Sequence, residues 1–270
     1  MMSTIDKIMV IIVGAFIVTA LMVTSSAATQ STFHLLPTGS ALPSDEACRA
    51  AVASDKVEPR PANSTANNTI PPASFLAGYR SSIANGEGGA DARFLQRVDG
   101  QFAGSTDAVL KWASCKWGFD EDVTRATAAN ESHWRQPGVG DVDSGISLGI
   151  LQIKARDYPS TCPAVAISQS PAKVNDPDCY AYRSTAFNAD YKLAQQRACF
   201  EGGVHYLTER TPMPGYPTYP NGSPTEMMWG CVGWWYSGGW YDAGAVKYIA
   251  EVKAHLADKP WLHAGLDGPD

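Results

Sequence analysis

The chain is poor in positive charge. Its 270 residues include 21 Lys and Arg against 27 Asp and Glu, which gives a net charge of −6 at pH 7. No stripe of Lys and Arg runs along the sequence, so we expect no basic surface that would neutralise the phosphates of DNA or RNA. Nucleic acid is therefore excluded as an expected partner.

The sequence also lacks the spacings that bind metals. None of its six cysteines belongs to a Cys-x-x-Cys pair, which argues against a zinc ribbon and against a redox dithiol. His133 has no second histidine at metal-ligand spacing. We therefore expect neither a metal nor a cofactor.

Long apolar runs are scarce, and the one that exists is at the N-terminus. It covers residues 8–23, follows Lys7, and precedes small residues that end at Ala27 and Ala28. Such a run with small-residue cleavage sites predicts an export signal over residues 1–28. A retained anchor, with transient attachment to a membrane, is the alternative. The protein is thus expected to be secreted or to stay in the cell envelope, in the periplasm or cell wall.

The cysteines that are present agree with export. Six cysteines in an exported chain predict disulfides, because oxidising compartments preserve them. About 15 complete pairings are open from sequence alone. The first expected pair would close one loop-like stretch, and the other two use the remaining cysteines: Cys162 with Cys179, Cys48 with Cys115, and Cys199 with Cys231.

Composition divides the rest of the chain into an arm, a domain and a tail. Residues 29–104 begin with a stretch rich in Ser, Thr, Asn, Ala and Pro without helical or strand period, so they are predicted to be a low-complexity linker or arm. A disulfide at Cys48 would make this segment an ordered arm instead of a free tether. Residues 105–256 form the predicted domain, and residues 257–270 form a C-terminal tail.

The domain is predicted to be mainly α. Ser105 and Gly118 are a candidate cap and stop for one helix, and Asp120 can cap a second helix with Glu131 in its last turn. The elements expected after it are a Gly/Asp/Ser loop over 138–149, a strand or buried turn over 150–153, a loop over 162–184, a helix over 187–207, and two helices over 227–256 that are broken at 237–239.

Two segments of the domain carry specific motifs, AANESHW over residues 128–134 and SGISLGILQI over residues 144–153. Together they resemble the soluble lytic transglycosylase family of the lysozyme-like superfamily. The signature of that family is a Glu-Ser pair at a helix end, followed by a Gly-Leu-Met-Gln-Ile-like block. The residues that match it are Glu131, Ser132, Gly149, Ile150, Leu151, Gln152 and Ile153.

Two further blocks resemble the family with departures. Gly203, Tyr206 and Leu207 fit its Gly-x-x-Tyr-Leu helix, but Cys199 stands where the family has Asn. Residues 235–238 stand where it has Tyr-Asn-x-Gly, and both the Tyr and the Asn are replaced. The resemblance covers residues 105–256 and implies a lysozyme-like helical domain with a short irregular strand and loop region.

The resemblance implies cleavage of the MurNAc–GlcNAc bonds of peptidoglycan, with Glu131 as the single acid and base. A glycosidic oxygen is a poor leaving group until it is protonated, so the carboxyl must stay neutral near the working pH. Ala128, Ala129 and Trp134 give Glu131 apolar neighbours in the sequence. In the family, the same Glu then takes the proton of the muramic acid 6-hydroxyl, which closes a 1,6-anhydro ring. A surface Glu that ends a helix is the plainer alternative.

Four polar residues are candidates for binding the sugar. Gln152 is an amide in an apolar run and needs partners, which are either substrate groups or the loop itself. Ser132 would bind a sugar or, at a helix end, the backbone. Ser144 and Ser147 are loop candidates for the same role. Ser147 also lies in a Gly-x-Ser-x-Gly sequence, but the strand before it and the helix after it that a nucleophile elbow needs are not expected.

Aromatic residues near the C-terminus are the other binding candidates. Four of the eight Trp lie between residues 229 and 240. Because aromatic planes cover the apolar faces of sugars, Trp235 and Tyr236 are expected to line the groove. The other three Trp are expected to pack in the core.

The number of carboxylates decides the expected reaction. Glycoside hydrolysis needs a second carboxylate, and the candidates, Asp141 and Asp143, are both expected to be solvated loop residues. A lytic transglycosylase that tolerates their loss is therefore the prediction. A goose-type lysozyme-like hydrolase, and a catalytically silent glycan-binding or structural envelope protein, are the alternatives.

Overall fold

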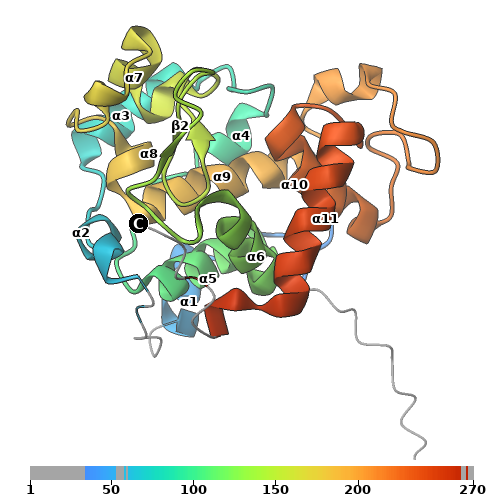
Figure 1. The fold of residues 1–270 in the computed structure, drawn as a ribbon, viewed down its shortest axis with the longest axis horizontal. Helices are drawn as coiled ribbons and strands as arrows, with labels where there is room; N and C mark the ends of the chain where they lie inside the picture. The colour runs from blue at the N-terminus through green and yellow to red at the C-terminus, as the bar shows by residue number, and fades with distance from the viewer. Residues whose placement is uncertain (1–33, 53–57, 59, 263–265, 267–270) are drawn as a thin grey trace, which may run out of the picture. The chain divides into compact units, whose positions relative to one another are not determined.

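The computed structural model describes residues 34–52, 58, 60–262 and 266. The predicted export signal over residues 1–28 lies outside this part of the chain. No helix among the described residues is long and apolar enough to cross a membrane. The fold is mainly helical, as predicted, and contains one small sheet (Figure 1).

The segment predicted as a linker or arm is folded where the structure describes it. Four buried residues at helical spacing pack it against the rest of the molecule: Phe75, Leu76, Tyr79 and Ile83. The prediction of an arm came from the polar stretch that precedes these four residues. The composition of that stretch did not indicate that the residues after it would pack in the core. Its helices are α1 (Asp45–Val52), α2 (Ser64–Asn67), α3 (Ala73–Ser82) and α4 (Ala92–Leu95), with a 3-10 turn at Pro61–Asn63.

Helix α5 (Thr106–Trp117) begins and ends at the predicted residues. The Ser105 hydroxyl accepts a hydrogen bond from a backbone N–H in the first turn, at 3.1 Å. Gly118 ends the helix with a φ of 70°, a conformation that glycine adopts without steric cost. Within the helix, Trp112 and Trp117 are fully buried. α5 is thus a core helix.

Helix α6 (Glu121–Ser132) follows at once, as predicted. The Asp120 carboxylate accepts hydrogen bonds from two backbone N–H groups of the first turn, at 2.9 and 3.0 Å. His133 ends the helix with a φ of 52°. Glu131 therefore lies in the last turn of α6.

A three-stranded antiparallel sheet follows α6, in the order β1-β2-β3. Its strands are short: β1 (Val139–Gly140), β2 (Ser147–Leu148) and β3 (Ile153–Lys154). β2 and β3 pair with Ser147 opposite Lys154 and Leu148 opposite Ile153. The stretch expected as a strand or a buried turn is therefore the turn of this hairpin together with the start of β3.

The loop predicted over residues 162–184 contains short helices. They are α7 (Pro163–Ser168), a 3-10 helix (Pro171–Lys173) and α8 (Tyr180–Arg183), and a 3-10 helix (Pro159–Thr161) comes just before. Proline begins three of the four, where its missing N–H costs no helical hydrogen bond.

Helix α9 (Thr185–Phe200) is buried along its whole length. α4, α5 and α8 pack against it, and it runs through the middle of the helices in Figure 1. The helix predicted over 187–207 ends earlier, because Gly202 has a φ of 80°. A 3-10 helix (His205–Glu209) follows instead.

Helices α10 (Pro224–Ser237) and α11 (Ala243–Asp258) confirm the predicted pair and its break. They pack against each other, and α11 also packs against α6. In the region expected as a tail, a last 3-10 turn (Pro260–Leu262) places Trp261 in a stack with Trp134, at 6.2 Å between ring centroids.

The structure contains the three expected disulfides. They are Cys48–Cys115 between α1 and α5, Cys162–Cys179 across the loop before α9, and Cys199–Cys231 between α9 and α10. Three disulfides indicate an oxidising compartment.

Candidate active site

Glu131 lines a groove at the end of α6. Its side chain is half-buried, and the groove has a volume of about 690 Å³. The β-hairpin forms one wall, and the end of α10, residues 234–238, forms another. Gly88, residues 156–158 and Tyr206 complete the lining from three other segments.

The environment of Glu131 keeps its carboxyl close to neutrality. Burial raises the pKa of Glu131 to about 7, against the lowering effects of a hydrogen bond from the Tyr248 hydroxyl and of the positive charge of Lys192. Asp141 raises this pKa and Lys154 lowers it, both to a smaller extent. At neutral pH the carboxyl is therefore available both as an acid and as a base.

Lys192 is the buried cation behind this groove. It lies on α9, its ammonium donates a hydrogen bond to Gln196, and its Nζ is 6.0 Å from the centroid of the Trp235 ring. Burial lowers the pKa of Lys192 to about 7, while Glu131 raises it. The charge states of Glu131 and Lys192 are therefore linked.

Three polar side chains bind the hairpin turn: Ser132 at the end of α6, Gln136 shortly after it, and Asn188 on α9. The Ile150 N–H donates to Gln136 Oε1 at 3.0 Å, and the Leu151 N–H donates to Asn188 Oδ1 at 2.9 Å. Ser132 Oγ donates to the Ile150 carbonyl at 2.8 Å. The turn is therefore bound both to the end of the helix that carries Glu131 and to α9.

Gly149, in the same turn, is required by the close packing. Its φ is 78°, and a Cβ at this position would lie 2.2 Å from Asn188 Nδ2 and 2.4 Å from the Ala181 carbonyl oxygen. The hydrogen bond from Ser132 to the Ile150 carbonyl brings the Glu-Ser and Gly-x-x-Gln blocks together in space.

The predicted sugar-binding residues divide between the groove and the scaffold. Gln152 and Ser147 line the groove. Ser132 does not line it: its hydroxyl bonds to the Ile150 carbonyl and accepts from the Arg135 N–H at 3.0 Å, which is the backbone alternative. Ser144 is exposed and lies outside the groove lining. Gln152 Nε2 donates to the Gly149 carbonyl at 2.8 Å, so part of its amide serves the turn.

Asp141 is an exposed loop residue, as expected, but its carboxylate is bound at the groove wall. Ser147 donates to its carboxylate at 2.7 Å, and Lys154 Nζ lies 3.2 Å away. Partial burial alone would raise the pKa of Asp141, but the bonds from Ser147 and Lys154 lower it below its ordinary value. An ionised carboxylate is thus held on the groove wall. Asp143 is exposed and lies outside the groove lining.

The aromatic wall comes from the end of α10, as predicted. Trp235 is half-buried, stacks on Tyr158 with 5.2 Å between centroids, and donates from Nε1 to the Leu151 carbonyl. Tyr236 is 61% exposed and stacks on Tyr248 at 4.9 Å. The other three Trp of this stretch are buried, although Trp234 also reaches the groove lining.

Several residues of the site could not be selected from the sequence. Tyr248 lies on the buried face of α11, where it looks like any core aromatic, and Lys192 lies in a fully buried helix. Their only sequence signal is a polar group on a buried face, which needs a partner. Lys154 and Tyr158 closely follow the recognised motif over residues 144–153 and could have been inferred from that proximity.

The fold and site define a mainly helical protein with one near-neutral carboxyl in an aromatic-lined groove. Comparisons with protein families, with curated proteins and with solved structures found no match.

Proposed function

We propose that this protein cleaves peptidoglycan glycan strands as a lytic transglycosylase of lysozyme-like fold, with Glu131 as its single acid and base. The observation that carries the proposal is the half-buried Glu131 carboxyl, with a pKa of about 7, in a groove lined by Gln152, Trp235 and Tyr236. Amide and aromatic groups suit the N-acetyl groups and apolar faces of amino sugars.

The reaction follows from one carboxyl that first gives and then takes a proton. Glu131 protonates the glycosidic oxygen, and the bond from that oxygen to C1 of the muramic acid breaks. The Glu131 carboxylate then accepts the proton of the 6-hydroxyl as O6 bonds to C1, which closes the 1,6-anhydro ring and restores the acid. An intramolecular nucleophile has the advantage of proximity over water.

The test is digestion of purified sacculi by the full chain, with mass spectrometry of the products. We expect muropeptides with 1,6-anhydro ends. Reducing ends would indicate a hydrolase, and the absence of products would indicate the silent glycan-binding alternative. The three disulfides agree with a site of action outside the membrane. The proposed export signal would direct the chain to that site.

A hydrolase is the second candidate, and the position of Asp141 favours it. An ionised carboxylate on the groove wall is what a water-activating base requires.

Substitution of this residue separates the two reactions. For the transglycosylase we expect Asp141→Asn to keep its activity within about tenfold, since no water is activated. Asp143→Asn serves as the control outside the groove lining. Loss of a general base would instead lower the rate about 100-fold or more. Initial rates on sacculi distinguish the two outcomes.

The aromatic wall gives a binding prediction. Trp235→Ala, made in an inactive Glu131→Gln background, should weaken the affinity for a peptidoglycan glycan fragment about tenfold, because it removes a sugar-stacking surface. Tyr236→Ala is the companion variant, since that side chain is largely exposed and costs little stability. Calorimetry measures the affinity, and thermal melting measures the stability. Lost stability with unchanged affinity in the folded fraction would make Trp235 a core residue only.

A further inference from the structure

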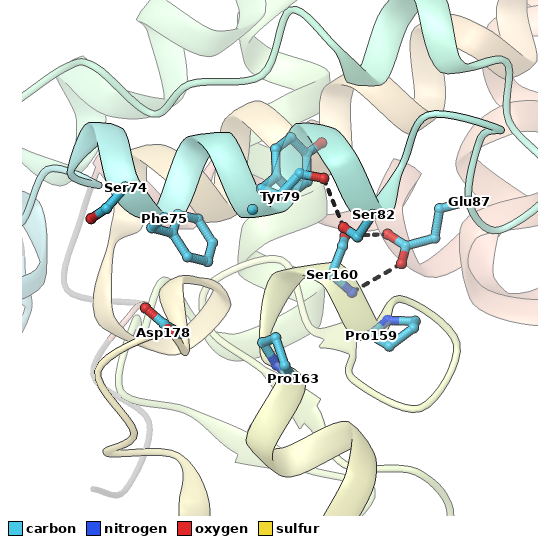
Figure 2. Close-up of a pocket in the computed structure, with 10 residues that line it drawn as sticks. Ser74, Phe75, Tyr79, Ser82, Glu87, Pro159, Ser160, Pro163 and Asp178 are labelled. Atoms are coloured by element: carbon cyan, nitrogen blue, oxygen red, sulfur yellow. Dashed lines mark hydrogen bonds between the residues drawn. The ribbon is translucent and has the colours of Figure 1, made fainter.

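A second pocket lies beside the Glu131 groove. It is formed between α3 and the segment around residues 159–163, has a volume of about 530 Å³, and is called the α3 pocket below (Figure 2). Glu87 lines this pocket and the next residue, Gly88, lines the groove. Likewise, Tyr158 lines the groove and Pro159 lines the pocket. Since consecutive Cα atoms are about 3.8 Å apart, the wall between the two is one chain thick.

The walls of the α3 pocket are fixed by covalent and hydrogen bonds. The Glu87 carboxylate accepts from the Ser160 N–H at 2.9 Å and also from the Tyr191 hydroxyl. The disulfide Cys162–Cys179 joins the two chain segments that contribute Pro163 and Asp178. The pocket is therefore formed before any ligand binds, which lowers the entropic cost of binding.

The lining of the pocket suits an organic cation on an aliphatic chain. Phe75 and Tyr79 line the pocket with the small parts of their side chains that the core leaves uncovered, and no Lys, Arg or His is among its described lining residues. Figure 2 shows Asp178 and Glu87 at opposite ends of the pocket. Glu87 is engaged by Ser160 and Tyr191, so Asp178, an exposed carboxylate, is the charge available to a ligand. A carboxylate attracts an ammonium group and accepts a charge-assisted hydrogen bond from it.

We propose that the α3 pocket binds the side-chain amine of the diamino acid in the stem peptide of the glycan strand that occupies the Glu131 groove. The proposal rests on the proposed function for the identity of the strand. Two residues separate this diamino acid from the muramic acid, and in extended form they span about 7 Å. A stem of that length reaches from the Glu131 groove across the wall, which is one chain thick, to the α3 pocket. Because a cross-link consumes the amine, the pocket selects stems that are not cross-linked through it.

Direct binding is the first arm of the test. A stem tripeptide that ends in the diamino acid is titrated into the full chain by calorimetry, beside the same peptide acetylated on the side-chain amine. We expect acetylation, or Asp178→Asn, to weaken binding about tenfold, through loss of one charge-assisted contact.

Gly78 allows the pocket to be filled without disturbing the core. It lines the pocket on the exposed face of α3, and an added Cβ meets no atom within 4 Å. Gly78→Leu should abolish peptide binding, and it favours the helix. Ala77→Leu places the same side chain at a neighbouring exposed position outside the pocket lining and should bind like the wild type.

A cleavage assay is the second arm of the test. Gly78→Leu and Asp178→Asn should slow cutting of peptide-bearing strands and leave cutting of peptide-free glycan unchanged. The proposal is overturned if the wild type does not bind the tripeptide, if acetylation has no effect, or if both variants bind it normally. A wild type that cuts neither strand contradicts the proposed function, while the binding arm still decides the role of the pocket.

Discussion

Replacement of Glu131 by Gln should leave the protein folded and reduce cutting of sacculi about a thousandfold or more. The amide keeps the shape of the side chain and still accepts the hydrogen bond of Tyr248, but it cannot supply the proton that the leaving oxygen needs. Release of muropeptides over time measures the loss.

Two controls accompany this variant. Its melting temperature should not fall below that of the wild type, because burial of the Glu131 carboxyl opposes its charged form and the amide removes that charge. Glu121→Gln, on the exposed first turn of the same helix, should keep full activity. A folded Glu131→Gln protein that still cuts at a near-normal rate would remove Glu131 from the mechanism.

The second large effect is expected at the hairpin turn. Gly149→Ala forces a non-glycine residue to a φ of 78° and places its Cβ 2.2 Å from Asn188 Nδ2. The backbone conformation costs about 1–2 kcal/mol, and the overpacking about 1–3 kcal/mol more. We expect a loss of about 2–5 kcal/mol in the free energy of unfolding, and lower activity in the folded fraction because the groove wall shifts relative to Glu131.

Gly215→Ala is the matched control. Its φ is 91°, but an added Cβ meets no atom within 4 Å, so it bears only the backbone cost. Denaturant unfolding of both variants gives the comparison. Equal losses in the two would mean that the turn does not need glycine for its packing against Asn188.

The sequence predicts best where local chemistry determines structure. Ser105, Gly118 and Asp120 mark the ends of α5 and α6, because caps and stops act within one turn. The break between α10 and α11 was predicted for the same reason. Glu131 could be placed in a last turn before any tertiary contact was known.

The features that could not be predicted from the sequence are those that depend on tertiary packing. A Ser/Thr/Asn-rich stretch suggested a tether, yet α3 buries Phe75 and Tyr79 against the neighbouring aromatic residues Tyr180 and Phe187. The approach of Tyr248 to Glu131 depends on the packing of α11 on α6, which no local pattern specifies.

The position of Asp141 is another tertiary effect. A loop Asp next to Gly and Val has no local feature that would fix it, and only the register that pairs β2 with β3 brings Ser147 and Lys154 to its carboxylate. The hairpin register therefore decides which of the two loop carboxylates reaches the groove.

The pKa of Glu131 tests the central claim most directly. A ¹³C NMR titration of the full chain follows its carboxyl carbon, identified by the signal that disappears in Glu131→Gln. We predict a midpoint at about pH 7. Lys192→Met should move it to higher pH, because the positive charge of Lys192 lowers the pKa of Glu131. A wild-type midpoint near the ordinary value of 4.5, unmoved by Lys192→Met, would contradict the role of Glu131 as a proton donor at neutral pH.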